Sequence, residues 1–221
     1  MKQFDLYDIL GFLAPGTITI LGVLHYYPQK FTFLRSTNLS VGEFGAVVLL
    51  AYIAGNLVAG VSTLLAKWNL FGGFPTNEIK CDNATIISHD EFGALEKALR
   101  EKNILKPEQS IKTLPEDEWY AATRKIHSYL DARGLTRRVE MFNAKFGMNR
   151  NLVVAFLLLI PISMWKVGLA DWKIDIVLGA CAGCAIYRLR EFAILYAQTL
   201  IRVFLVAPEK PTCNSTASDG E

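Results

Sequence analysis

Two cysteines three residues apart, Cys181 and Cys184, are the side chains best placed for chemistry in this chain. Helix positions i and i+3 share one face, so the two thiols could be oxidised to a disulfide and reduced again. Such a pair would suit an intramembrane thiol-disulfide oxidoreductase. Gly179 and Gly183 place the same cysteines in a GxxxG pattern, and cysteine is small enough for close helix packing. Neither connection predicted outside the membrane holds a second cysteine pair to relay electrons, so packing is favoured.

A second group of small residues lies in an apolar stretch before residue 67. Ala51, Gly55 and Ala59 recur every four residues, which predicts a flat face for close contact with a helix of the same or another chain. Asn56 lies next to this group, near the middle of the stretch. An amide is costly in hydrocarbon unless it is hydrogen-bonded, so we expect Asn56 to face another helix or a wet cavity. Holding helices together is the favoured role, and lining a pore or a subunit interface is the alternative.

Three arginines, Arg133, Arg137 and Arg138, form a basic group near a predicted membrane border. We interpret them as cytosolic anchors that contact lipid headgroups, with an anionic ligand or nucleotide as the alternative partner. The sequence shows no metal-ligand spacing, Ser-His-Asp arrangement or phosphate-binding glycine loop. It therefore predicts no metal, no cofactor and no enzymatic activity. A net charge of +2 gives no strong field for nucleic acid, so no sequence-specific nucleic-acid binding is expected.

Four apolar stretches position these groups, and one long charged segment separates them into two pairs. A bilayer core takes ~20 helical residues, and the first two stretches have that length. The third also fits if Lys166 extends its ammonium group to the interface, whereas the fourth spans only if the helix beyond it lengthens the run. We therefore predict an all-α integral membrane protein with four transmembrane helices and a cytosolic helical insertion between spans two and three. The stretches cover residues 9–27, 44–66, 152–172 and 176–187.

The charge distribution predicts the division and the orientation of the chain. Lys and Arg near span ends favour the cytosolic side, and they concentrate in the long segment and after the fourth stretch. Both termini are therefore predicted to lie in the cytosol, with the protein in a bacterial inner (plasma) membrane. The predicted parts are transmembrane helices one and two in residues 1–66, the insertion in 67–150, spans three and four with a C-terminal helix in 151–207, and a disordered tail in 208–221.

Helical periodicity organises the insertion. It predicts one helix over residues 90–102 and a second that begins at an N-cap, Thr113, and ends at Gly134. A third helix is predicted to run unbroken from residue 136 to residue 165, directly into the third span. Because a rigid helix transmits movement, its residues Phe142, Phe146 and Arg150 are predicted to couple the insertion to the bilayer. The predicted apolar faces hold Phe92, Leu95 and Leu99 in the first helix, and Trp119, Ala122, Ile126 and Leu130 in the second.

Proline inside the first span has a local consequence. Pro15 lacks an amide hydrogen, so it leaves one backbone carbonyl without its usual helical donor. We expect a neighbouring helix, Thr17 or Thr19 to satisfy that carbonyl, because an unpaired polar group is costly within a bilayer.

Several membrane segments carry a resemblance to a known kind of protein. They are FDLYDILGFLAPG at residues 4–16, LAYIAGN at 50–56, residues 138–150 with Phe142 and Asn143 at the centre, and the arginine and aromatic stretch after the fourth apolar run. The chain resembles small four-span bacterial membrane proteins of antiphage defence operons, such as the membrane subunit of the Kiwa defence system. The resemblance does not cover residues 70–130. It implies a defence sensor or effector that works with a cytosolic protein.

These observations together predict a non-enzymatic membrane protein that forms a homo-oligomer. It would sense or recruit a cytosolic protein partner or ligand and respond with a pore, a membrane disturbance or partner release. The alternatives are the thiol-disulfide oxidoreductase using Cys181 and Cys184, and a small transporter. The transporter is disfavoured because Asn56 is the one convincing polar residue in the middle of a predicted span.

Overall fold

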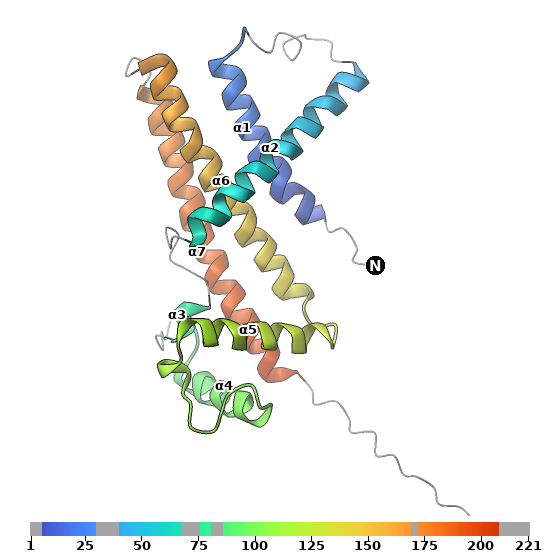
Figure 1. Ribbon diagram of the computed structural model, residues 1–221, viewed down its shortest axis with the longest axis vertical. Coiled ribbons are helices and arrows are strands. Elements are labelled where there is room, and N and C mark those ends of the chain that lie inside the picture. The colour runs from blue at the N-terminus through green and yellow to red at the C-terminus, as the bar shows by residue number, and fades with distance from the viewer. Residues whose placement is uncertain (1–5, 30–39, 68–75, 81–85, 169–171, 208–221) are drawn as a thin grey trace, which may run out of the picture.

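The computed structural model describes residues 6–29, 40–67, 76–80, 86–168 and 172–207, and the regular structure in these ranges is all helical (Figure 1). This confirms the predicted all-α class for the described residues, while the tail predicted to be disordered, 208–221, lies outside them. The elements are α1 (Leu6–Tyr26), α2 (Val41–Lys67), α3 (Asn77–Lys80), α4 (His89–Glu101), a 3-10 helix (Ile111–Thr113), α5 (Glu116–Asp131), α6 (Arg137–Val167) and α7 (Trp172–Val206).

Two long helices form the axis of the molecule. α6 and α7 run side by side, α1 and α2 cross at one end of this pair, and α4 and α5 lie at the other end (Figure 1). α6 is unbroken from Arg137 to Val167, as predicted for residues 136–165, and ends at Gly168 with a φ of 65°. Its 31 residues measure about 46 Å, which exceeds a hydrocarbon core of about 30 Å.

Only part of the predicted four-span arrangement is shown. Among the described helices, two are long and apolar enough to cross a membrane, over Val41–Ala66 in α2 and Arg137–Lys166 in α6. The apolar part of α1, Gly11–Tyr26, is shorter than a full span. α7 is long, but Asp175 at its start and Arg188 in its middle bound a short apolar run. The structure therefore supports two candidate spans by length and composition.

The insertion folds around one hydrophobic core at the end of α7. α4 and α5 bury the faces that the periodicity predicts, and the indole nitrogen of Trp119 donates a hydrogen bond of 2.8 Å to the carbonyl of Thr76. The sequence did not predict that α7 completes this core. We call residues 76–80 and 86–139, together with the end of α7, the helical module. α7 contributes Ala197, Leu200, Ile201 and Phe204 to its core.

Different residues determine where α4 and α5 begin and end. Ser88 and Glu91 form a reciprocal capping box at the start of α4, in which the carboxylate of Glu91 accepts from the Ser88 amide at 2.9 Å. This hydrogen bond from the Ser88 amide stabilises the carboxylate and lowers the pKa of Glu91 below its ordinary value. The predicted N-cap of α5 at Thr113 is wrong, because Thr113 belongs to the 3-10 helix and α5 begins after Pro115. Gly134 follows α5 with a φ of 68°, which agrees with the predicted end.

Candidate functional site

α1 and α2 cross with their backbones in direct contact. A Cβ atom added at Gly16 would lie 1.8 Å from the carbonyl oxygen of Ala51, and one added at Gly55 would lie 1.9 Å from that of Phe12. Real Cβ contacts are far longer, so this crossing requires glycine at both positions. The structure thus places Ala51 and Gly55, two of the small residues identified in the sequence, at a contact within the chain.

A buried polar contact joins α1, α2 and α6 beside this crossing. Pro15 has no amide hydrogen to offer the carbonyl of Gly11, and the side-chain amide of Asn151 on α6 donates to that carbonyl at 3.4 Å. The hydroxyl of Ser62 on α2 lies 2.6 Å from Oδ1 of Asn151. Ser62 and Asn151 are both buried. We call Gly11, Ser62 and Asn151 the three-helix junction.

The partners fix the orientation of the Asn151 amide. A backbone carbonyl only accepts hydrogen bonds, so Nδ2 must face Gly11, and Oδ1 is left for the Ser62 hydroxyl. Thr19 does not serve Gly11, because its hydroxyl donates to the carbonyl of Pro15 at 2.9 Å. The expected donor is therefore on a neighbouring helix. The sequence feature that could have indicated this donor is the pair of asparagines, Asn149 and Asn151, at the start of the apolar run in α6.

The predicted coupling residues lie along α6 before Asn151, on the side of the three-helix junction that leads to the helical module. Arg150 is half-buried next to the junction, and its Nη2 lies 3.4 Å from the hydroxyl of Thr63 on α2. Phe142 and Phe146 are half-buried closer to the helical module. Between them, the ammonium group of Lys145 lies 6.0 Å from the ring centre of Phe142 and 5.5 Å from that of a ring on α7, Phe192. Arg150 thus contacts α2, and Lys145, between the two phenylalanines, contacts α7.

Asn56 does not face another helix of this chain. It is exposed, and its side-chain amide donates to the carbonyl of Tyr52 on its own helix at 2.9 Å. The reason is the helical step of about 100° per residue, which turns Asn56 away from the face that Gly55 presents to α1. Ala59 is half-buried, and its carbonyl accepts from the hydroxyls of Ser62 and Thr63 at 2.9 and 2.8 Å.

The small-residue face of α7 points outward in the same way. Gly179 and Gly183 are exposed, and a Cβ atom at either would meet nothing within 4 Å. α7 buries Ala182, Ala185 and Leu189 instead, so the GxxxG pattern does not pack helices within this chain. Cys181 is half-buried and Cys184 is exposed, and both are free thiols.

The basic group identified in the sequence is divided. Arg133 is half-buried with its guanidinium carbon 3.5 Å from the ring centre of Tyr129, and its Nη1 donates to the carbonyl of Tyr129 at 3.1 Å. Arg137 and Arg138 are exposed at the start of α6. The structure therefore assigns Arg133 to the surface of α5, where aromatic stacking fixes its position.

The geometry at the three-helix junction is suited to holding helices in one arrangement. Side-chain hydrogen bonds connect three helices at one level, and two glycines set the separation of two of them. Within the described ranges, no three His, Cys, Asp or Glu side chains are grouped so that they could hold a metal ion. Comparison with protein-family models, curated proteins and solved structures found no match to this chain.

Proposed function

We propose that this chain is an oligomeric bacterial membrane protein that couples a cytosolic partner or ligand to a response of the bilayer. In this proposal α1, α2, α6 and α7 provide four spans, and both termini are cytosolic. The response is a pore, a membrane disturbance or the release of a bound partner. The resemblance of the membrane segments to antiphage defence proteins supports a role as a defence sensor or effector, without enzymatic activity.

The surface of the helical bundle supports insertion into a bilayer. Only 17 % of the most apolar stretch of α2 is buried, whereas the core helix of a soluble domain is mostly buried. Trp165 and Trp172 are exposed at one end of the α6–α7 pair, as aromatic residues are at membrane interfaces. Arg150 and the exposed Arg188 lie further along the α6–α7 pair, toward the helical module. Arg150 and Trp165 are 15 residues apart, which corresponds to about 22 Å of helix.

The observation that carries the coupling proposal is the continuity of α6 and α7. Each helix passes from the apolar bundle into the helical module without a break. The far end of α7 lies inside the module core, where Phe204 is buried and Arg202 pairs with Glu91 at 3.1 Å. A displacement of the module must therefore displace α7, and α6 packs along α7.

The outward-facing polar and small residues support the oligomer. The Asn56 amide lies on an apolar surface, where its nitrogen donates to the carbonyl of Tyr52 on its own helix and its oxygen can accept from another molecule. A second copy offers the same amide, so two chains could satisfy each other. Gly60, one turn further along α2, is exposed and would allow close approach.

The orientation is tested by cysteine labelling in cells. In a background with all four native cysteines replaced by serine, we expect Gln29→Cys to react with a membrane-impermeant maleimide in spheroplasts. Glu108→Cys should react only after permeabilisation, because the helical module is cytosolic in this proposal. Both side chains are exposed, so protein burial does not prevent labelling. Labelling of Glu108→Cys in intact spheroplasts would show that the helical module lies outside the cytosol and that the proposed topology is wrong.

The coupling is tested by flexible insertions. We expect overexpression of the wild-type chain to depolarise cells, as measured with a potential-sensitive dye. A Gly-Gly pair after Gly147 in α6 should weaken this response, and pairs after both Gly147 and Arg190 should abolish it, because α7 is a second rigid connection. The control carries Gly-Gly after Pro107, in the loop between α4 and the 3-10 helix. Full depolarisation by the double insertion would refute rigid coupling, and none by the wild type would count against a pore.

A further inference from the structure

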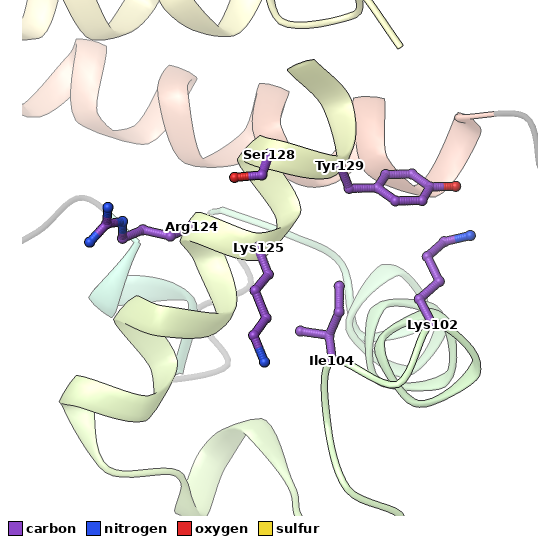
Figure 2. A pocket seen from close by; sticks show the side chains of 6 residues that line it. All are labelled: Lys102, Ile104, Arg124, Lys125, Ser128 and Tyr129. Atoms are coloured by element: carbon purple, nitrogen blue, oxygen red, sulfur yellow. The ribbon is translucent and has the colours of Figure 1, made fainter. Parts of the chain in front are cut away.

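The helical module contains a groove of about 620 Å³ between α5 and the end of α4 (Figure 2). In Figure 2, Lys125 points into the space between α5 and Ile104, and Tyr129 and Lys102 lie together at one side. Arg124 points away from Ile104, so its guanidinium lies at the opposite edge. The residues that line the groove are Lys102, Ile104, Arg124, Lys125, Ser128 and Tyr129.

The cations of this groove lack anionic partners among the described residues. Three other basic side chains of the module are paired with carboxylates: Lys97 with Glu101 at 3.9 Å, Arg100 with Glu96 at 3.5 Å, and Arg202 with Glu91 at 3.1 Å. Lys102 and Lys125 form no ion pair within the described part of the chain, and no carboxylate lines the groove. Their positive charges are therefore available to a ligand.

The ring of Tyr129, at one side of the groove, holds two cationic side chains close to each other. The ammonium group of Lys102 lies 4.8 Å from the ring centre of Tyr129, and the guanidinium carbon of Arg133 lies 3.5 Å from it. Two cations thus share one ring, and Lys125, one turn before Tyr129 on α5, extends along the groove on the other side of Ile104 (Figure 2). A ligand with one negative charge would leave this group largely uncompensated, whereas a phosphate group carries up to two charges and several acceptor oxygens.

We infer that the groove binds a phosphate-bearing ligand. The flexible side chains of Lys102 and Lys125 reach the phosphate oxygens from opposite sides of the groove, and the exposed hydroxyl of Ser128 offers a neutral donor in the same groove. Ile104 provides an apolar wall for the remainder of the ligand. The phosphate can belong to a soluble phosphorylated compound or to a lipid headgroup, and the recognition chemistry is the same.

This site deepens the proposed function and rests on it for one step. Lys102 lies 5.8 Å from the ring centre of Phe204, which packs edge-on against Tyr129 at 5.6 Å. A phosphate that draws Lys102 toward Lys125 would weaken its contact with these two rings. Because Phe204 belongs to α7, ligand binding would change the packing at the end of a proposed transmembrane helix.

The test is the binding of inorganic pyrophosphate to the full-length protein in a neutral detergent, measured by calorimetry at low salt. We expect the wild-type chain to bind, and Lys102→Gln with Lys125→Gln to lower the affinity about tenfold or more. The matched control, Lys97→Gln with Lys106→Gln, removes the same charge from exposed positions outside the groove and should keep the wild-type affinity. Unchanged thermal unfolding of both variants would show that they are folded.

Nanodiscs distinguish the two sources of phosphate. With phosphatidylcholine alone, pyrophosphate should bind as it does in detergent. If added phosphatidic acid weakens pyrophosphate binding to the wild type, the groove takes a headgroup; if it has no effect, the groove takes a soluble ligand. No pyrophosphate binding, or equal loss in the groove and control variants, would overturn the inference. The coupling proposal is judged separately by depolarisation, which does not use pyrophosphate.

Discussion

Replacing Gly55 with alanine will force α1 and α2 apart and destabilise the folded protein by about 2 kcal/mol or more. The new Cβ atom would lie 1.9 Å from the carbonyl oxygen of Phe12 and 2.6 Å from its carbonyl carbon. Both are backbone atoms, so no side-chain rotation can relieve the clash. We expect the midpoint of thermal unfolding in detergent to fall, and the close contact between Gly16 and Ala51 to be lost as well.

The matched control is Gly60→Ala in the same helix. A Cβ atom at Gly60 meets nothing within 4 Å, and alanine favours a helix over glycine by up to about 1 kcal/mol. This substitution should therefore leave the unfolding midpoint unchanged or raise it in the monomeric protein. Equal midpoints for Gly55→Ala and Gly60→Ala would show that the α1–α2 crossing does not have the geometry described.

Replacing Asn151 with leucine will destabilise the three-helix junction by about 1–3 kcal/mol. The carbonyl of Gly11 loses its donor and remains in an apolar environment, where an unpaired polar group is costly. Ser62 is less affected, because its hydroxyl also lies 2.9 Å from the carbonyl of Ala59. Thermal unfolding in detergent measures the loss, and the fold should otherwise be retained.

A double-mutant cycle with Pro15→Ala identifies the cause. Alanine restores an amide hydrogen at position 15, which can bond to the carbonyl of Gly11 within α1. The cost of Asn151→Leu should therefore be smaller in the Pro15→Ala protein than in the wild type. If the two substitutions are additive, Asn151 stabilises the bundle by some other contact.

Periodicity predicted the local structure of the helical module well. Phe92, Leu95 and Leu99 recur at helical spacing, and so do Trp119 and Ile126, because each helix must bury one face against the same core. The continuity of α6 also followed from local signals. These features depend on residues within a few turns of one another, which is the range over which a single sequence carries information.

The helix contacts could not be predicted in the same way. Small residues at a four-residue spacing indicate a flat face, but the sequence does not say whether another helix covers it. Gly55 meets α1, whereas Gly183 faces outward with the same pattern around it. The junction depends on Gly11 and Asn151, which are 140 residues apart, and on the angle at which their helices cross. The groove likewise needs Lys102 and Lys125 to come from different helices.

The completion of the module core by α7 has a consequence for biosynthesis. The ribosome makes α4 and α5 before α6, and the core residues Leu200 and Phe204 come last. Until α7 has been made, the core formed by α4 and α5 lacks the side chains of Ala197, Leu200, Ile201 and Phe204, and the apolar surface that they cover stays exposed to water. A chain that stops before Leu200 therefore leaves a hydrophobic surface of the kind that chaperones and proteases recognise. The module core is therefore complete only once the ribosome has made the chain through Phe204.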